Sequence, residues 1–188
     1  MSFINKALSG IFGSKTDKDL KELGPYVGKI NAFYSQYQQL SHDQLRAKKE
    51  EFKKRIVDYL AELENELKTL DGRIETETEM DMQDKETIFA QIDKLKKDRN
   101  IKIEEILLEI LPEAFAVVKE TAHRFKEIKS LEVTATEHDK NLATHKTNVK
   151  ISGDKAVWEN TWLAAGGEIT WDMLHYDVQL IGGVTLHQ

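Results

Sequence analysis

The feature that most constrains the fold of this chain is a pair of long segments with helical periodicity. Apolar residues recur mostly at three- and four-residue steps from Leu45 to Leu70, and again from Ile88 to Ile110. Such spacing places them along one face of a helix, the pattern of a helix that packs along another helix. The positions are Leu45, Phe52, Ile56, Tyr59, Leu63, Leu67 and Leu70, then Ile88, Ile92, Leu95, Ile103, Ile106 and Ile110. We therefore expect two long helices that bury these stripes against each other.

Local signals predict where this pair begins and turns. Ser41 followed by Gln44 is a capping-box pattern, which predicts a helix start. Asp71 and Gly72, followed by a run of Glu and Thr, predict a polar turn. Residues 41–110 are therefore predicted to fold as an antiparallel helical hairpin. Its Glu and Lys residues, often three or four apart, fit both a solvated extension and a docking arm for a partner, and both interpretations stay open.

Composition narrows the classes of function. The 188 residues include only 10 Gly and 2 Pro, which favours long helices, and no Cys, which excludes disulfides and thiolate chemistry. A net charge of −6 argues against a general nucleic-acid surface, because neutralising phosphates requires a basic face. None of the six histidines lies in the paired helical spacing typical of zinc ligands, so no metal site is predicted.

Residues 1–15 predict a short amphipathic helix. Its apolar side is flanked by lysines and suits the interface of an anionic membrane; docking on a neighbouring domain explains the pattern equally well. The candidate membrane- or partner-binding residues are Phe3, Ile4, Lys6, Leu8, Ile11 and Phe12. The segment lacks the long apolar run of a secretory signal, so the chain is expected in the cytosol.

The segments on either side of the hairpin predict shorter elements. Residues 16–40 form a helical connector that is expected to break at Gly24-Pro25. Pro112 is expected to open a helix, since a first-turn proline is tolerated there. The polar, Thr-rich sequence from Leu131 to Ser152 predicts short strands around a loop.

Three tryptophans, Trp158, Trp162 and Trp171, flank a predicted turn at Gly166-Gly167. They fit either a base-stacking platform or packing anchors. We favour packing, because Trp158 and Trp162 have helical spacing.

The end of the chain carries the candidate binding motif. A helix is predicted to begin after Thr170, with Asp172 in its first turn, and to stop at Gly182-Gly183. Residues 184–188 then predict the start of a strand. Gln179 lies on the predicted helix, and its amide offers an acceptor beside a donor, which can satisfy N6 and N7 of adenine together.

The stretch His175-Tyr-Asp-Val-Gln-Leu-Ile-Gly-Gly183 resembles the adenine-reading motif of the SecA family, the ATP-driven preprotein translocase motors of bacteria. Three further blocks match the family in the same order: residues 11–21, residues 40–56, and Leu111-Pro-Glu-Ala-Phe-Ala-Val-Val-Lys-Glu120. Together they cover less than half the chain. The hairpin and the stretch from 126 to 170 are longer than the common family pattern.

The resemblance implies a mainly α fold in which residues 111–188 begin a RecA-like (P-loop) motor domain, the first nucleotide-binding domain, left incomplete here. Gln179 would contact the adenine of ATP, Met173 and Tyr176 would line its pocket, and Asp177 would orient the turn. The phosphate loop and the magnesium ligands would lie beyond Gln188. No catalytic residue is therefore assigned, and these residues alone are expected to be inactive.

By the same resemblance, the partners would be the SecYEG channel, preprotein substrates and acidic phospholipids. The protein would associate peripherally with the inner face of the cell membrane. The alternative is a non-enzymatic helical adaptor with a membrane-touching N-terminal helix and a coiled-coil hairpin. A nucleic-acid helicase is a third and weaker interpretation, because the acidic charge balance and the other family blocks count against it.

Overall fold

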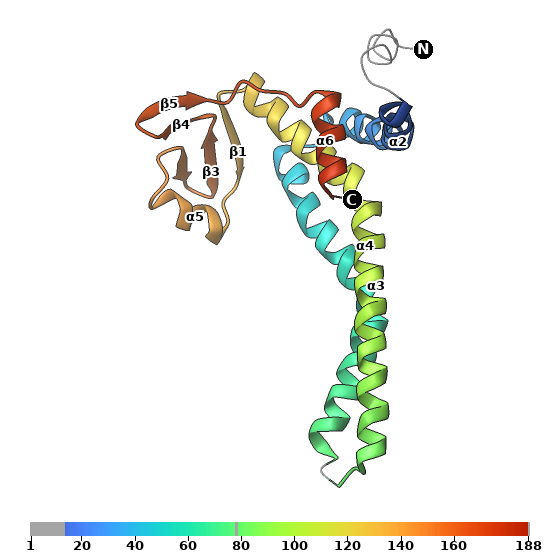
Figure 1. Cartoon of the computed structure of the whole chain (residues 1–188). Coiled ribbons are helices and arrows are strands. Elements are labelled where there is room, and N and C mark those ends of the chain that lie inside the picture. Colours follow the sequence, from blue (N-terminus) through green and yellow to red (C-terminus); the bar gives the residue numbers. More distant parts are fainter. Residues whose placement is uncertain (1–13, 78, 188) are drawn as a thin grey trace. The chain divides into compact units, whose positions relative to one another are not determined.

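The computed structural model describes residues 14–77 and 79–187, with side-chain environments from Lys21 onward (Figure 1). The predicted membrane-binding residues, from Phe3 to Phe12, lie outside this range. The elements are helices α2 (Ser14–Tyr37), α3 (His42–Thr76), α4 (Met82–Glu127), α5 (Glu137–Ala143) and α6 (Asp177–His187), and strands β1 (Ser130–Thr134), β2 (Val149–Ser152), β3 (Lys155–Glu159), β4 (Thr161–Ala164) and β5 (Gly167–Thr170). The mainly helical fold with a few short antiparallel strands confirms the predicted class.

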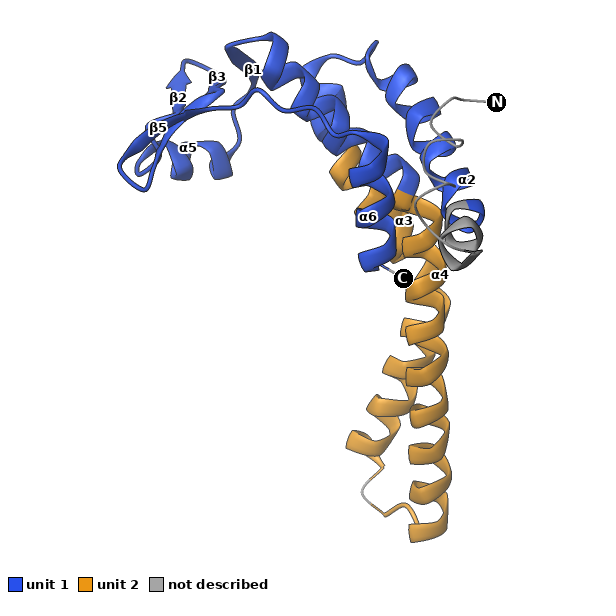
Figure 2. Cartoon of the chain, turned by 45° about the horizontal axis from the view of Figure 1, so that its top comes forward, with its two compact units in different colours: residues 1–47, 112–188 blue, residues 48–111 orange. Residues whose placement is uncertain are grey.

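The chain divides into two compact units (Figure 2). Unit 1 comprises residues 1–47 and 112–188, and unit 2 comprises residues 48–111. Helices α3 and α4 each continue from one unit into the other, so unit 2 is inserted into the sequence of unit 1.

Unit 2 is an antiparallel helical hairpin that falls almost entirely within the predicted hairpin of residues 41–110. The apolar stripes meet in a buried cluster of Leu63, Leu67, Leu70, Ile88 and Ile92. Polar pairs also join the two helices: Arg55 to Glu109 at 2.8 Å, Tyr59 to Glu105 at 2.9 Å, and Arg99 to Glu64 at 2.7 Å. The residue numbers of these partners rise along α3 while they fall along α4. The two helices are therefore antiparallel.

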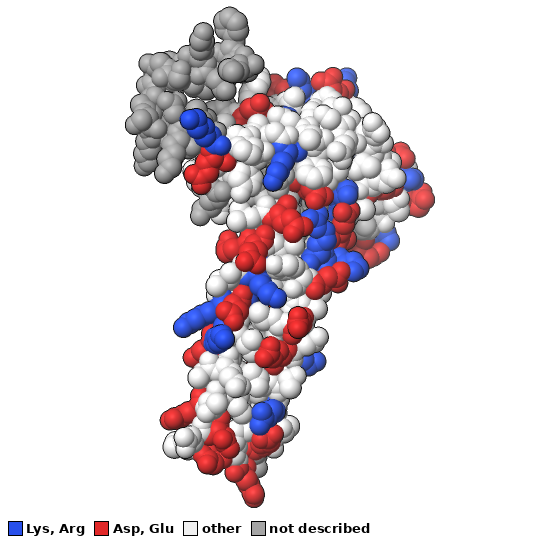
Figure 3. Space-filling view, turned by 90° about the vertical axis from the view of Figure 1, so that its right-hand side faces the viewer, with Lys and Arg blue, Asp and Glu red and all other residues white. Residues whose placement is uncertain are grey.

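The hairpin turn lies later than predicted. Helix α3 continues through Asp71 and Gly72 to Thr76, and α4 begins at Met82. Burial of Leu70 and partial burial of Ile74 against the hairpin cluster extend the packed face past the glycine. This packing offsets the modest cost of about 1 kcal/mol for a glycine inside a helix. Acidic and basic side chains are interspersed along the hairpin on the face shown in Figure 3.

Both prolines lie inside helices, which corrects two predictions. Pro25 does not break α2, and Pro112 lies within α4 instead of opening a helix. An internal proline removes one hydrogen bond and costs roughly 3 kcal/mol. Apolar residues are buried on both sides of each proline, Leu23 and Val27 in α2 and Leu111 and Ala116 in α4. Continuous packing along these faces therefore offsets the missing hydrogen bond.

The strands of unit 1 form two small antiparallel sheets. One has the order β1-β3-β2, and the other pairs β4 with β5. Strand β1 alternates buried Leu131 and Val133 with exposed neighbours, as a half-buried strand should. The predicted strands between Leu131 and Ser152 are confirmed as β1 and β2, with helix α5 between them.

The turn between β4 and β5 has positive φ at Ala165 and Gly166, so it begins one residue before the predicted glycine pair. Trp158 lies on β3 and Trp162 on β4, so the helical spacing assumed for them is wrong.

A buried carboxylate joins the β1-β3-β2 sheet to helix α3. Asp139 is fully buried and accepts hydrogen bonds from Arg46 at 2.8 Å and from the Trp158 indole at 3.2 Å. Beside it, Asp43 accepts the backbone N–H and the hydroxyl of Thr134, both at 2.8 Å. These bonds from Thr134 lower the pKa of Asp43. Burial opposes ionisation of Asp139, but hydrogen bonds from Thr136 and Arg46 outweigh it and lower its pKa.

Arg124 of α4 holds the turn between α2 and α3. Its guanidinium pairs with buried Glu120 at 2.7 Å and donates to the carbonyl oxygens of Tyr37 at 3.0 Å and Leu40 at 2.8 Å. It also bonds Nδ1 of His42 at 3.0 Å. Because a guanidinium only donates, that nitrogen must be the unprotonated acceptor. Burial, and then the charge of Arg124, lower the pKa of His42 below its ordinary value of 6.5.

These shifts predict a loss of stability in acid. His42 has a lower pKa in the folded state than in the unfolded state, so the unfolded state takes up its proton first. The free energy of unfolding should then fall as pH drops below about 6.5, and fall again below about 3.8 as Asp43 and Asp139 are protonated.

Urea unfolding between pH 7 and pH 3 checks this. His42→Gln should remove the first step, whereas the control His138→Gln, at an exposed position on α5, should retain it. An unchanged first step in His42→Gln would contradict the assignment.

Candidate functional site

The candidate site is the first turn of α6 and the segment that leads into it. Helix α6 begins at Asp177, six residues later than predicted, and Asp172 lies in the irregular stretch before it. The Tyr176 N–H donates to Oε1 of Gln179 at 2.9 Å, and the Tyr176 carbonyl accepts from the N–H groups of Gln179 and Leu180. A glutamine that reaches back three residues is one half of a capping box. Gln179 therefore fixes the start of its own helix.

The helix then runs through the two glycines. It ends at His187, so the predicted stop at Gly182-Gly183 is wrong. The predicted strand over 184–188 is also wrong for residues 184–187, which are the part of it that the structure describes. Leu180 and Val184 lie one turn apart and are buried, Val184 completely. A Cβ on Gly183 would lie 2.5 Å from Cε1 of Phe115, so glycine allows α6 to approach α4 closely. Tertiary packing thus decides the conformation at the glycine pair.

A polar network ties the start of α6 to two other helices. Lys119 of α4 donates to Oδ1 of Asn31 at 2.7 Å and lies 3.7 Å from Oδ1 of Asp177. Asn31 of α2 donates through Nδ2 to the same Asp177 oxygen at 3.1 Å. The Lys119 ammonium lies 5.0 Å from the ring centroid of Tyr34, a cation–π contact. The sequence indicated only that Asp177 orients this turn; it gave no signal for Asn31 or Lys119.

Two of the three residues predicted to contact adenine, Tyr176 and Gln179, are joined at this turn by a hydrogen bond, and Met173 lies in the segment that leads into it. Tyr176 is 73% exposed and Met173 is 55% exposed, and Gln179 is also exposed. A carbonyl oxygen has two lone pairs, so Oε1 of Gln179 keeps one acceptor site after bonding Tyr176, and its NH2 group makes no hydrogen bond to any residue that the structure describes. This surface could accept an adenine edge without rearranging the helix. The contact itself stays a prediction.

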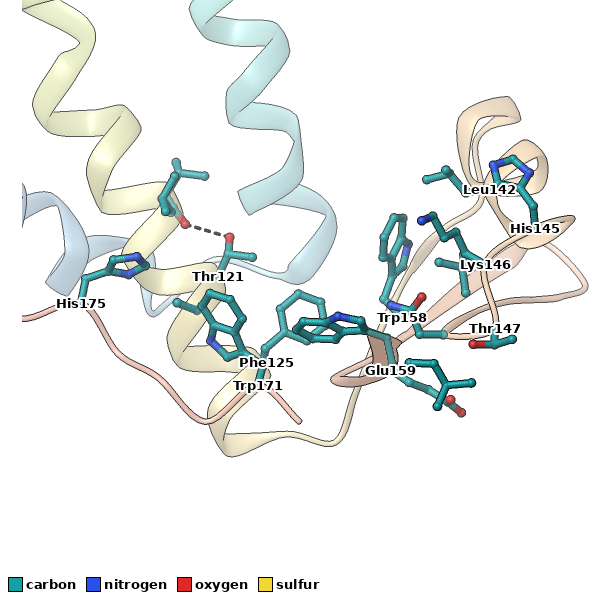
Figure 4. Close-up of a pocket in the computed structure, with 17 residues that line it drawn as sticks. Thr121, Phe125, Leu142, His145, Lys146, Thr147, Trp158, Glu159, Trp171 and His175 are labelled. Atoms are coloured by element: carbon teal, nitrogen blue, oxygen red, sulfur yellow. Dashed lines mark hydrogen bonds between the residues drawn. The ribbon is translucent and has the colours of Figure 1, made fainter. Parts of the chain in front are cut away.

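The three tryptophans gather at an apolar pocket of about 800 Å³ between the end of α4 and the strands of unit 1 (Figure 4). The rings of Trp162 and Trp171 lie 6.4 Å apart at 33°. The indole N–H of Trp158 bonds Asp139, and that of Trp171 bonds the Met173 carbonyl at 2.9 Å. These internal bonds favour packing over base stacking. Trp171 in addition fixes the backbone of the segment that precedes α6.

Within residues 14–77 and 79–187, no helix combines the length and the apolar character needed to cross a bilayer. The same residues contain no group of three or more His, Asp or Glu side chains placed to hold a metal ion.

The comparisons with known proteins agree on one family. The sequence model of the SecA DEAD-like domain family matches residues 8–188. The protein translocase subunit SecA of Flavobacterium psychrophilum is 50% identical over 188 residues, which is 100% of this chain and 17% of that protein. The corresponding subunits of Phocaeicola vulgatus and Parabacteroides distasonis are 49% and 46% identical over 98% of the chain, and 17% and 16% of their own lengths. The chain thus spans about a sixth of these relatives. No solved structure gave a significant match.

The glycine pair offers a matched test of the packing of α6. Gly183→Ala forces a methyl group against the Phe115 ring and should lower the free energy of unfolding by about 1–3 kcal/mol. Gly182→Ala meets no atom within 4 Å and should be neutral or stabilising by about 0.5–1 kcal/mol, because alanine favours a helix. Urea unfolding of both variants measures the difference. Equal effects would show that the close approach to Phe115 does not hold.

Proposed function

The chain belongs to the SecA protein translocase family, and we propose that it supplies the adenine-reading part of an ATP-driven protein translocase. The observation that carries the proposal is the amide of Gln179. It is exposed at the first turn of α6, and its orientation is set by the bond from the Tyr176 N–H at 2.9 Å. A base-reading group needs such a fixed orientation, because a freely rotating amide must be ordered when the ligand binds.

The bound base would pair with this amide along one edge. The NH2 group of Gln179 donates to N7 of adenine, and the adenine N6 amine donates to the remaining lone pair of Oε1. Tyr176 and Met173 are exposed, and in this proposal they cover the base with aromatic and apolar surface. Guanine has a carbonyl where adenine has the N6 amine, so two acceptors would face each other and the site selects ATP.

The chemistry of ATP hydrolysis belongs elsewhere in this proposal. The phosphate loop, the magnesium ligands and the arginine finger lie outside residues 1–188, and these residues alone neither hydrolyse ATP nor bind it tightly. Hydrolysis in the whole protein drives preproteins through the SecYEG channel. These roles rest on family membership.

Residues 1–15 are proposed to contact acidic phospholipids and the channel. Peripheral association with the inner face of the cell membrane would follow. Because the apolar residues from Phe3 to Phe12 lie outside the described range, this part of the proposal rests on their sequence pattern.

The reading frame provides the first check. We expect the codons after that of Gln188 to encode a glycine-rich stretch ending in Gly-Lys-Thr within about two dozen residues, the phosphate loop that the proposal requires. A stop codon directly after Gln188 would overturn the ATP-motor proposal and favour the helical adaptor. Sequencing the source reading frame decides between them.

Substitution of Gln179 separates its two roles. Gln179→Glu keeps an acceptor for the Tyr176 N–H and should leave α6 folded, since Glu serves equally in a capping box. It removes the donor to N7, so the Kd for ATP should rise about tenfold or more. Gln179→Ala loses both roles and should lower both stability and ATP affinity.

These effects are measured on the product of the full reading frame, by ATP titration and thermal unfolding. ATP binding by Gln179→Glu with the parent affinity would contradict adenine reading by this side chain.

A further inference from the structure

Lys119 is a buried cation in the middle of the apolar face of α4, between buried Ala116 and Ala122. It is 7% exposed. An ammonium removed from water is strongly destabilising unless its charge and its donors are matched. The matching groups are Asn31, Asp177 and the Tyr34 ring, which come from α2 and α6. The lysine therefore lies where these three helices meet.

The direction of each hydrogen bond in this network is fixed by chemistry. A lysine ammonium only donates and a carboxylate only accepts, so Asn31 must turn its oxygen to Lys119 and its NH2 group to Asp177. The distances of 2.7 Å and 3.1 Å agree with that order. An aspartate at position 31 would have no hydrogen to donate and would set two carboxylates against each other. The network thus requires an amide at this position.

Asp177 transmits this constraint to the candidate adenine site. It is the first residue of α6 and lies two residues before Gln179. Its negative charge also suits the N-terminus of a helix. Burial of Leu180 and Val184 fixes how α6 packs, and the hydrogen bond from Asn31 together with the ion pair to Lys119 fixes its first turn.

We infer that Lys119 and Asn31 are positioning residues for nucleotide recognition: they hold Asp177, and through it the first turn of α6, so that Gln179 meets the adenine edge in one orientation. The inference rests on the proposed function. It adds that base selectivity is controlled from α2 and α4, by residues that do not touch the base.

The test measures discrimination between ATP and purine riboside triphosphate, which lacks the N6 amine. It uses the ATPase of the full reading-frame product, with kcat and KM determined for each nucleotide. The variants are Lys119→Met, which removes the charge at similar length, Asn31→Asp, which replaces the NH2 donor with a charged acceptor at the same size, and Lys119→Arg as the conservative rescue. Lys140→Met, at an exposed ion pair on α5, is the control.

We expect Lys119→Met and Asn31→Asp to raise KM for ATP about five- to tenfold, by more than kcat falls, and to lose most of the preference for ATP over the analogue. Lys119→Arg should restore much of that preference, and Lys140→Met should match the parent. Should Lys119→Met fail to fold, as judged by circular dichroism, Asn31→Asp carries the same test.

Gln179→Ala, assayed in parallel, separates the two proposals. If it retains the parent preference for ATP, adenine reading by Gln179 is wrong. If it loses the preference while Lys119→Met and Asn31→Asp retain it, adenine reading stands and the positioning role is overturned.

Discussion

Unit 1 depends on the buried pair of Arg124 and Glu120. The carbonyl groups at the end of a helix have no partner within that helix, and burying them unpaired is costly. The Arg124 guanidinium donates to the carbonyl of Tyr37, the last residue of α2, and to that of Leu40 in the following turn, while Glu120 balances its charge. Removing one member of a buried ion pair leaves an uncompensated charge and lowers the free energy of unfolding by about 3–5 kcal/mol. The turn from α2 to α3, and with it the position of Asn31 on α2, therefore depends on one side chain of α4.

The features that the sequence predicted correctly depend on residues close together in the chain. The hairpin follows from apolar periodicity, and the helix start at Ser41 is confirmed by reciprocal bonds with Gln44 of 2.8 and 3.1 Å. What could not be predicted depends on distant residues. The conformation at Gly183 is decided by Phe115, and the network at the candidate site joins Asn31 to Asp177 across most of the chain. No local pattern encodes these contacts, so the prolines, the glycine pair and the two positioning residues were missed or wrongly interpreted.

At the candidate adenine site, too, one role of a residue could be predicted from the sequence and another could not. Gln179 was found from the donor and acceptor chemistry of one side chain, which the sequence displays directly. Its second role, as the acceptor that starts α6, requires knowing that Tyr176 is the residue before the helix. One amide thus starts the helix and is also exposed to solvent. A substitution that damages one role will often damage the other, and for this reason glutamate is a more informative replacement than alanine.

The insertion of unit 2 within the sequence of unit 1 has a consequence for the order of folding. Residues 1–47 must find residues 112–188, and closing a long flexible loop between them would be entropically unfavourable and slow. The hairpin is built from contacts that spread outward from its own turn, and the pair of Arg55 and Glu109 lies near its open end. Once the hairpin has formed as far as that pair, the flexible loop between the two segments of unit 1 is much shorter. The hairpin can thus shorten the search by which the two segments of unit 1 find each other.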